Sequence, residues 1–251
     1  MYNVKCDVAI IGGGPAGLAA AIAAKEEGAE KVLILERDNA LGGILQQCIH
    51  DGFGLHRFGK RMSGNEYAQN FIDELETTDI EVLLDTMVLE VTQDKVIYAC
   101  NNKDGMMEIT AGAVILAMGC RERAKGALNI AGTRPAGIFT AGQAQSMINL
   151  KKMDIGDDVL ILGSGDVGLI VARRLKILGK NVIAVFGEEE YYSNAGELKT
   201  RLYVAREFPV DQIGAQKVPK KKEAEKKGGD FKQGEAFMDV PKTDAGYVPF
   251  C

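Results

Sequence analysis

The chain has 251 residues, 46% of them hydrophobic, which is enough for one or two domains with real cores. Its formal net charge of -5 at pH 7 gives no general reason to expect nucleic acid or an anionic membrane surface as a partner. The most apolar run, residues 16–24, is too short to span a bilayer, and five cysteines without a CxxC or CxxxxC pair suit a reducing, cytoplasmic location.

The first predicted element is a buried strand over residues 8–11, which a glycine-rich turn joins to an alanine-rich helix. In this turn Gly12 suits a tight bend, Gly14 lets the backbone approach a pyrophosphate, and Gly17 lets helix and strand pack closely. The free N–H groups at the start of the helix would then face the phosphates. The pattern therefore predicts the first half of a dinucleotide site.

A second strand is predicted over residues 32–35 and is followed by Glu36, 19 residues after Gly17. A carboxylate at this place can accept hydrogen bonds from both ribose hydroxyls of an adenine nucleotide. Because strand, glycines, helix, second strand and terminal acid all agree, the segment predicts a nucleotide-binding βαβ unit.

Residues 44–61 have little periodicity and predict a long loop, a kind of segment that is usually functional in compact domains. The segment contains Cys48 and both histidines, His50 and His56. A histidine can donate a proton near neutral pH, and the cysteine could be a single redox thiol. Alternatively, the histidines only hydrogen-bond the loop and the thiol is inert. Two histidines without nearby acids or paired cysteines lack the ligands for a metal site.

A helix and a group of short strands follow this loop. Ser63 and Glu66 have the spacing of a capping box, ahead of a core-facing helix that runs to about Thr77. Strands are then expected over residues 81–84, 86–92, 95–100, 106–110 and 114–117, with a hairpin connection over 101–105. The middle strands predict a three-stranded meander, and the last strand is expected to return to a parallel sheet.

The opening pattern then repeats. A strand is predicted over residues 159–162, a helix over 169–178 and a second strand over 182–186, with Gly163, Gly165 and Gly168 at the turn. Such a repeat is stronger evidence than either copy alone. Two dinucleotide sites in series imply one bound flavin and one exchangeable nicotinamide cofactor.

The second copy is less complete than the first. Gly187 stands 19 residues after Gly168, where the first copy has an acid, and Glu188 follows it directly. A slightly longer loop could bring Glu188 to the ribose, or this glutamate is a solvated surface charge. No arginine follows the strand to meet a 2′-phosphate, which favours NADH over NADPH. Farther on, residues 218–229 have mixed charge and no apolar face, as expected of a solvated or disordered segment or of a basic patch for a partner.

Three segments of the first unit resemble flavoproteins. Glu36 and Arg37, followed by Leu41, Gly42 and Gly43, resemble the FAD-binding variant of the fingerprint, in which a second glycine pair lies over the pyrophosphate. The alternative is that this glycine pair is an ordinary loop. Residues 86–91, with Val88, resemble the strand whose backbone holds the adenine ring. Residues 113–119 resemble the apolar strand that ends in Ala-Thr-Gly, with Met118 in place of the threonine and Gly119 after it.

The chain as a whole resembles the NAD(P)/FAD-dependent oxidoreductases of the pyridine nucleotide–disulfide oxidoreductase superfamily, especially bacterial members encoded near anaerobic glycerol-3-phosphate dehydrogenases. The resemblance covers residues 1 to about 187 and is carried by LGGILQQCIHDGFGLH (41–56), AMGCRER (117–123), GTRPAGI (132–138) and GSGDVGL (163–169). Members normally end with a late strand that carries Gly-Asp. Only Gly229-Asp230 has a late position here, so we expect the C-terminal portion to be absent or divergent.

The resemblance implies an α/β fold of two Rossmann-like units. We expect a FAD-binding domain with a β-meander insertion over residues 1–150, a shortened NAD(P)-binding domain over 151–190, and an unassigned tail over 191–251. The implied activity is hydride transfer from NAD(P)H to FAD and on to a small-molecule or protein acceptor. The alternative is a nucleotide-binding subunit or truncated chain that needs a second subunit, or a homodimer, for activity.

The expected site residues follow from the motifs and the resemblance. The expected cofactor-binding residues are Gly12, Gly14, Pro15, Ala16, Gly17, Glu36, Arg37, Gly42, Gly43, Val88, Met118, Gly119, Gly163, Gly165, Asp166, Gly168 and Glu188. The expected catalytic residues are Cys48, His50 and His56, although no dithiol follows Gly43 and a disulfide-reductase mechanism is not expected. Arg121 or Arg123 could bind a phosphate, or form a surface ion pair with Glu122.

Overall fold

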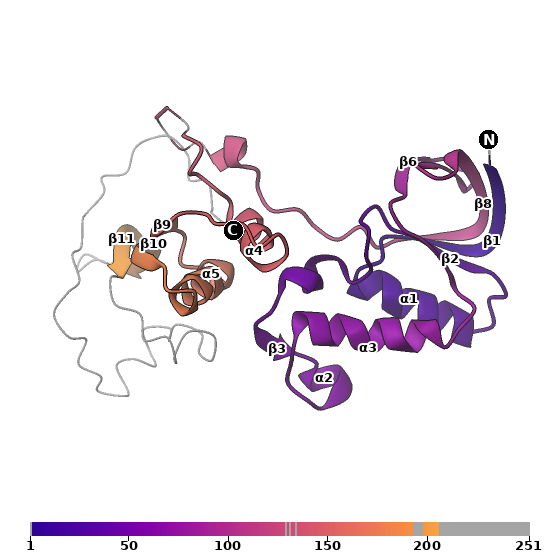
Figure 1. Cartoon of the computed structure of the whole chain (residues 1–251), viewed down its shortest axis with the longest axis horizontal. Coiled ribbons are helices and arrows are strands. Elements are labelled where there is room, and N and C mark those ends of the chain that lie inside the picture. The colour runs from indigo at the N-terminus through magenta and orange to yellow at the C-terminus, as the bar shows by residue number, and fades with distance from the viewer. Residues whose placement is uncertain (1, 129, 131, 134, 193–197, 206–251) are drawn as a thin grey trace. The chain divides into compact units, whose positions relative to one another are not determined.

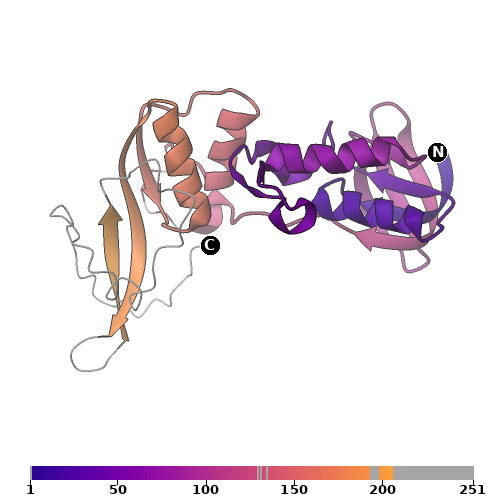
Figure 2. The ribbon, with the colours of Figure 1, turned by 90° about the horizontal axis from the view of Figure 1, so that it is seen from below.

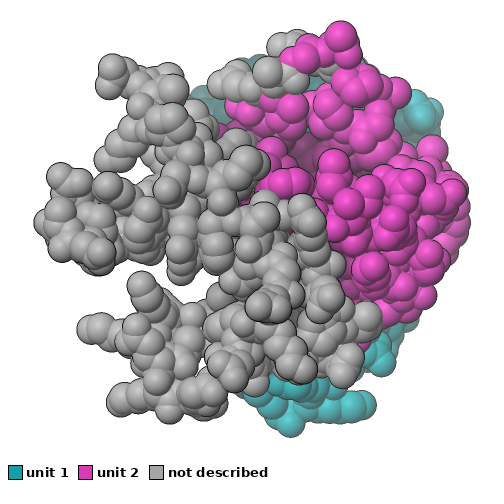
Figure 3. Space-filling model, turned by 90° about the vertical axis from the view of Figure 1, so that its left-hand side faces the viewer, with its two compact units in different colours: residues 1–121 teal, residues 122–251 magenta. Residues whose placement is uncertain are grey.

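A computed structural model of the chain describes residues 2–128, 130, 132–133, 135–192 and 198–205. The predicted charged run at 218–229, the Gly229-Asp230 pair and Arg134 lie outside these residues. The chain divides into two compact units, residues 1–121 and 122–251, which Figure 3 shows in different colours.

The first unit is built on a six-stranded sheet in the order β5-β2-β1-β8-β7-β6. Its strands are β1 (Tyr2–Ile11), β2 (Val32–Leu35), β5 (Glu81–Leu83), β6 (Met87–Val91), β7 (Val96–Asn101) and β8 (Gly105–Leu116). The strands β5, β2, β1 and β8 are parallel, whereas β6, β7 and β8 form the antiparallel meander that the sequence predicts. The connection between β7 and β8 is the predicted hairpin, held by Asn101 Oδ1, which accepts hydrogen bonds from the amides of Lys103 and Asp104.

One long strand, β8, takes the place of the two strands expected over residues 106–110 and 114–117. It pairs with β1 from Met107, opposite Tyr2, to Leu116, opposite Ile11. The prediction of a separate returning strand is wrong because small residues do not interrupt this pairing. A Cβ at Gly112 would lie 2.8 Å from the carbonyl oxygen of Asp7 on β1, so the glycine permits a close approach instead of a break.

Two helices, α1 (Pro15–Glu26) and α3 (Gly64–Glu76), lie side by side on one face of this sheet (Figures 1 and 2). Their apolar side chains form one core with β1 and β2; its fully buried members include Ile10, Leu18 and Ile34. The predicted capping box begins α3, where the Glu66 carboxylate accepts hydrogen bonds from Ser63 N at 2.7 Å and Ser63 Oγ at 2.6 Å. Burial of each large apolar side chain contributes about 1.5–3 kcal/mol, so the helices are held by the sheet.

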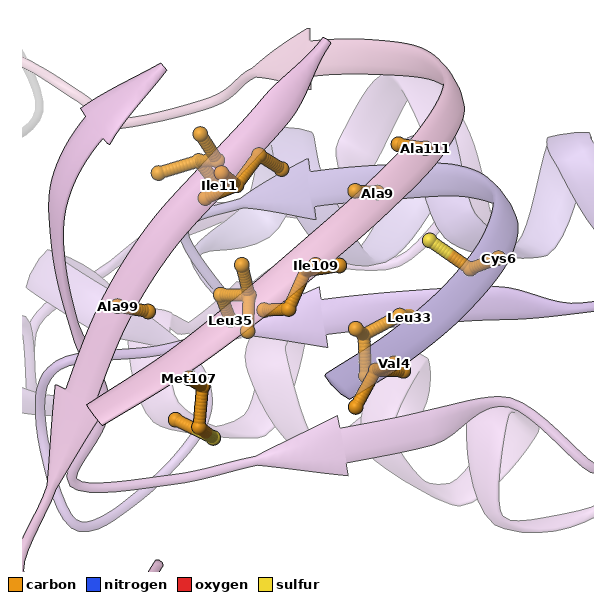
Figure 4. Packing of buried hydrophobic residues seen from close by; sticks show 11 residues of the cluster. Val4, Cys6, Ala9, Ile11, Leu33, Leu35, Ala99, Met107, Ile109 and Ala111 are labelled. Atoms are coloured by element: carbon orange, nitrogen blue, oxygen red, sulfur yellow. The ribbon is translucent and has the colours of Figure 1, made fainter. Parts of the chain in front are cut away.

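A second core joins the meander to the parallel strands. Figure 4 shows its side chains gathered from β1, β2, β7 and β8. Leu33, Ile97, Met107 and Ile109 are fully buried in it. The two cores together fix the ends of β1 and β2, where the predicted nucleotide-binding residues begin.

Short elements replace the long loop predicted over residues 44–61. They are η1 (Gly43–Gln47), β3 (Asp51–Phe53), α2 (Leu55–Phe58) and β4 (Met62–Ser63), with β3 and β4 paired antiparallel. Aromatic rings hold them to α3, with Phe58 5.5 Å from Tyr67 and 5.7 Å from Phe71 between ring centroids. Elements of two to five residues leave no readable periodicity, which is why the sequence predicted a loop.

The second unit repeats the βαβ arrangement. Its elements are η2 (Lys125–Leu128), α4 (Ala141–Asn149), β9 (Asp158–Leu162), α5 (Asp166–Ile177), β10 (Asn181–Tyr192) and β11 (Leu198–Ala205). The strands β9 and β10 are parallel, and β11 pairs antiparallel with β10. Ile148 of α4 packs with Val171 and Leu175 of α5, which explains why the unit begins before residue 150.

The second strand of this unit is longer than predicted. The sequence predicted an end at Phe186 and no element beyond Glu190, but β10 continues to Tyr192 and β11 follows it. Three consecutive glutamates at 188–190 interrupt the apolar pattern, so the sequence gives no strand signal there. Within the described residues, no helix is long and apolar enough to cross a membrane.

Candidate functional site

The first glycine turn has the geometry that its sequence predicts. Gly12 has φ +108°, a value that favours glycine, and its N–H donates to the carbonyl oxygen of Leu35 at 2.8 Å. A Cβ at Gly12 would collide with the carbonyl oxygen of Ala117, and a Cβ at Gly17 would collide with that of Gly12. These two glycines therefore set the close packing of β1, α1 and β8.

Gly14 differs from its neighbours because nothing lies within 4 Å of the position of a Cβ there. It is the N-cap of α1, which has no side-chain cap, no acid in its first turn, and Pro15 at its start. Ala16 is exposed beside it. An open, uncapped helix start whose backbone N–H groups need acceptors fits a phosphate group.

Glu36 completes the turn from the end of β2. Its side chain is buried, and its carboxylate accepts hydrogen bonds from Gly13 N at 2.6 Å and Asp38 N at 2.8 Å. A carboxylate has about four acceptor positions, so two remain for the ribose hydroxyls. The backbone contacts orient the carboxylate and leave the predicted ribose contact possible.

The second glycine pair lies against the first glycine turn. Gly42 N donates to the carbonyl oxygen of Gly13 at 2.8 Å, and a Cβ at Gly43 would lie 3.1 Å from Gly14 Cα. The pair thus belongs to the same group of residues as Glu36 and the helix start. This arrangement agrees better with the flavoprotein-like interpretation than with an independent loop.

The sequence interpretation missed two residues of this group. Gly13 supplies both the N–H to Glu36 and the carbonyl to Gly42, and a Cβ there would lie 2.5 Å from Leu41 Cδ2. The sequence signal for Gly13 was that it makes three consecutive glycines, whereas the spaced motif requires glycine only on either side of it. Thr86 is buried and its N–H donates to the carbonyl oxygen of Glu36 at 2.8 Å, a long-range contact without a local sequence signal.

The remaining residues predicted to bind the flavin lie farther along the same unit. Val88 is on the edge strand β6, pairs with Ala99 and packs on the second core. Met118 and Gly119 follow β8 directly, with the Met118 side chain 66% exposed. Arg37 follows Glu36, and its side chain is half exposed. Of these positions, Met118 lies beside the glycine turn, since a Cβ at Gly12 would lie 3.3 Å from the Met118 backbone nitrogen. The cofactor roles of all of them remain predictions.

The three predicted catalytic residues lie on the segment between η1 and α2. Cys48 is half-buried, with Sγ 3.3 Å from the carbonyl oxygen of Ile44, and burial raises the pKa of its thiol. His50 Nδ1 lies 3.1 Å from the carbonyl oxygen of Asp51. His56 is exposed on α2. His50 makes its described contacts within this segment, whereas the carbonyl oxygen of Cys48 accepts a hydrogen bond from Gly64 N of α3 at 2.7 Å. The catalytic roles remain predictions.

We expect iodoacetamide to alkylate Cys48 more slowly than Cys120 at neutral pH, by roughly tenfold for each unit by which its pKa is raised. The reactive species is the thiolate, so the rate at Cys48 should climb as pH rises toward its raised pKa. Mass spectrometry of the native protein over time measures both sites, with the exposed Cys120 as control. Equal rates at pH 7 would contradict the expectation. Full activity of Cys48→Ser would contradict a redox role.

The second glycine turn reproduces the packing of the first. Gly163 has φ +118°, its N–H donates to the carbonyl oxygen of Phe186 at 2.7 Å, and a Cβ at Gly168 would collide with the Gly163 carbonyl. Gly165 is the N-cap of α5 and is open, as Gly14 is in the first unit. Asp166 occupies the first position of α5. The helix dipole stabilises an acid at this position, but the acid would compete with a phosphate for the same helix start.

The end of the second strand differs between the units. Gly187 is the counterpart of Glu36, because each follows the residue whose carbonyl accepts the first glycine N–H. Glu188 lies within β10, where its backbone is paired with Leu202 of β11. Its side chain is not among those that the structure describes. The sequence interpretation placed Glu188 just beyond the strand, and the added length of β10 corrects that placement.

The hydrogen-bond partners of Glu122 are at the start of α4, and they are not the arginines beside it. Its carboxylate accepts hydrogen bonds from Thr140 Oγ1 at 2.5 Å, Gly142 N at 2.8 Å and Gln143 N at 2.9 Å. It therefore caps the start of α4, where a negative charge is favourable. The surface ion pair expected for Glu122 is not among the ion pairs of the described residues, and anion binding by Arg121 or Arg123 remains a prediction.

Removing this cap should loosen α4. We expect Glu122→Ala to destabilise the second unit by about 1–2 kcal/mol, the usual cost of losing a helix cap. Hydrogen exchange of residues 141–149 should become faster. The matched control is Arg123→Ala, which should leave the exchange of these amides unchanged. An equal effect of both substitutions would instead indicate an ion pair.

The comparisons with known proteins agree with this architecture. A solved L-proline dehydrogenase from P. horikoshii superposes with a TM-score of 0.60 over 80% of this chain and 39% of the other, at 22% identity, and so shares the fold. Hydrogen cyanide synthase subunit HcnB of Pseudomonas protegens is 28% identical over 179 residues, 70% of this chain and 37% of that protein. Sarcosine oxidase subunit alpha of Rhizobium meliloti is 27% identical over 195 residues, 72% of this chain and 18% of that subunit.

The chain thus spans well under half the length of these two relatives. The family description of the pyridine nucleotide-disulphide oxidoreductases matches residues 6–230, which is most of the chain and includes both glycine turns. Members of this family bind FAD and pyridine nucleotides. With a Rossmann-like α/β fold and a repeated βαβ unit, the chain belongs to the pyridine nucleotide-disulphide oxidoreductase family.

Proposed function

We propose that this chain is a flavoprotein oxidoreductase that takes a hydride from NAD(P)H with FAD and passes electrons to a small-molecule or protein acceptor. The observation that carries the proposal is the group formed by the first glycine turn, Glu36 and the second glycine pair. An open helix start for phosphate, an oriented carboxylate for ribose and a second glycine pair beside them suit a dinucleotide. FAD would supply the redox chemistry, and the protein would supply position and electrostatics.

Each unit would have its own task. Gly14 and the start of α1 would hold the FAD pyrophosphate, and Glu36 would hold the adenine ribose. Gly165 and the start of α5 would hold the nicotinamide dinucleotide, with Asp166 reducing the attraction of that helix start for phosphate. A weaker hold suits a cofactor that must leave after each turnover, whereas the acid-free start of α1 suits a resident one.

The test is the visible spectrum of the purified chain, followed by an anaerobic titration with NADH and with NADPH. We expect a flavin spectrum, with about one flavin per chain, that bleaches on addition of the reduced nucleotide. A colourless protein that stays colourless with added FAD would overturn the proposal for the isolated chain.

A second candidate function is a nucleotide-binding subunit that needs a partner chain. In the first unit β1 lies between β2 and β8, but its counterpart β9 pairs only with β10 among the described strands. Leu160 and Leu162 of β9 are 60% and 58% exposed. An open apolar edge strand is a place for another chain to add a strand. Two relatives are, by name, subunits.

The two candidates differ in where activity resides. The first predicts flavin reduction by NAD(P)H in the isolated chain. The second predicts that flavin is gained only with a partner, and that Leu160→Lys and Leu162→Lys in β9 prevent the association while leaving the fold intact. Size-exclusion chromatography with light scattering, alone and with a candidate partner, separates these outcomes.

A further inference from the structure

His50 lies on a short segment that is fixed to the start of α3 on both sides of the histidine. Before it, the carbonyl oxygen of Cys48 accepts a hydrogen bond from Gly64 N at 2.7 Å, and a Cβ at Gly64 would lie 2.6 Å from Cys48 Cβ. After it, Asp51 of β3 pairs with Ser63 of β4, the N-cap residue of α3. Because α3 is packed on the core of the sheet, a side chain between these two points has a defined place.

The imidazole ring of His50 is itself held by two neighbours. Its centroid lies 5.3 Å from the ring centroid of Phe53, which lies 6.3 Å from that of Tyr67 on α3. On its other side, Nδ1 lies 3.1 Å from the carbonyl oxygen of Asp51. No ring contact of this kind includes His56 among the described residues. The two histidines of the segment therefore differ, because only the ring of His50 is held in one orientation.

The contact at Nδ1 decides which nitrogen of His50 carries the proton. A carbonyl oxygen can only accept a hydrogen bond, so Nδ1 must carry a hydrogen to make this one. The neutral ring then has its lone pair on Nε2, and the imidazolium releases a proton from Nε2 without losing the bond to Asp51. The residue is half-buried, and within the described part of the chain its ring has no second hydrogen bond. Nε2 is therefore available to a ligand.

The same segment begins at the group of residues proposed to hold FAD. Its first residue is Gly43, where a Cβ would lie 3.1 Å from Gly14 Cα at the start of α1. The helix η1 leads from there to Cys48 and His50. A proton carrier that is fixed on a segment leaving the cofactor-binding turn suits a reaction in which electrons and a proton must reach the same acceptor.

We propose that His50 donates, through Nε2, the proton that completes the reduction of the acceptor, and that Phe53 is the residue that positions its ring. This step rests on the proposed function and specifies the acceptor as one that takes up two electrons and two protons. The acceptor receives both electrons and one proton as a hydride equivalent, which returns the cofactor to its oxidised form. It receives the second proton when the Nε2–H bond of the His50 imidazolium breaks. His50 is left neutral, with Nδ1–H on the Asp51 carbonyl, and water returns a proton to Nε2.

The first test does not depend on activity. His50 and His56 are the only histidines, so a long-range ¹H–¹⁵N spectrum of the full chain, at a pH where both rings are neutral, shows the tautomer of each. We expect His50 to carry its proton on Nδ1, and His56 to show the mixture of a free imidazole. Phe53→Leu should return His50 to a mixture. The matched control is Phe58→Leu, which removes a ring of the same cluster that does not contact His50 and should leave its tautomer unchanged. A neutral His50 with its proton on Nε2 would overturn the proposal.

The second test compares two electron acceptors during turnover with whichever of NADH and NADPH reduces the protein. Menadione takes up two electrons and two protons, whereas ferricyanide takes up one electron and no proton. His50→Asn lacks the Nε2 group, but its amide can still donate to the Asp51 carbonyl. We expect this variant to reduce menadione at least about a hundredfold more slowly and to reduce ferricyanide within about twofold of the unmodified rate. Phe53→Leu should slow menadione reduction by about tenfold, with the same small effect on ferricyanide.

The outcomes separate the proton role from the proposed function. Equal slowing of both acceptors by His50→Asn would show a structural effect and overturn the proton role, as would menadione reduction at the unmodified rate. Reduction of ferricyanide without menadione by the unmodified chain would contradict the proposed class of acceptor. Failure of the unmodified chain to reduce either acceptor would instead contradict the proposed function, on which the proton role rests.

Discussion

Gly14→Ala is expected to weaken flavin binding while leaving the fold intact. Gly14 has φ -76° and ψ -176°, an extended conformation that alanine adopts readily, and its Cβ would meet no atom within 4 Å. We expect the free energy of unfolding to stay within about 1 kcal/mol, because alanine lowers the conformational entropy of the unfolded chain and this offsets the poorer N-cap. The added methyl would instead occupy the place of the pyrophosphate and weaken FAD by at least about tenfold.

The matched variant is Gly17→Ala, three residues along the same turn. Its Cβ would collide with the carbonyl oxygen of Gly12, a backbone atom that cannot move without displacing β1. We expect a loss of about 3 kcal/mol in the free energy of unfolding, the upper range for overpacking. Urea denaturation and flavin absorbance measured on both variants separate folding from binding. Retention of normal flavin by Gly14→Ala would show that the pyrophosphate does not approach this glycine.

Local sequence signals were sufficient wherever one element was long and periodic. The glycine turn and helix of each unit, and the strand β9, were predicted within a few residues, because the turn requires glycine and a buried strand is apolar. The strand β1 begins at Tyr2, well before the predicted start at residue 8, because residues 2–6 pair with β8. The capping box at Ser63 and the hairpin at Asn101 were likewise local. The family was inferred from the resemblance of the glycine turns and the segments beside them, and the comparisons confirm it.

The sequence was insufficient where contacts between distant residues decide the structure. The continuation of β8 through Gly112 depends on pairing with β1, more than 100 residues earlier. The cap that Glu122 gives to α4 spans 18 residues to Thr140, so the neighbouring arginines appeared the more natural partners. That Ser164 and Gly187 take the places of Gly13 and Glu36 becomes clear only when the structures of the two turns are compared. Single-chain patterns contain none of these relations.

Glu36→Ala is expected to lower both stability and flavin affinity, because the carboxylate has two roles. It is 5% exposed and accepts the N–H groups of Gly13 and Asp38, so its removal leaves backbone donors without their acceptor. We expect a loss of about 2 kcal/mol in the free energy of unfolding, the usual cost of a buried unsatisfied donor. The loss of the ribose contacts should weaken FAD by about tenfold or more.

Glu36→Gln divides the two roles, because the amide keeps the shape and one acceptor but places a donor against one backbone N–H. It should destabilise the fold by about half as much as the alanine variant, since one of two backbone contacts survives. The control is Glu26→Gln, an exposed glutamate at the end of α1, which should change the unfolding free energy by less than about 0.5 kcal/mol. Thermal unfolding with and without FAD measures both effects: a ribose role predicts that added FAD stabilises Glu36→Ala less than it stabilises the control. Equal stabilisation of both would leave Glu36 as a structural acceptor for the glycine turn alone.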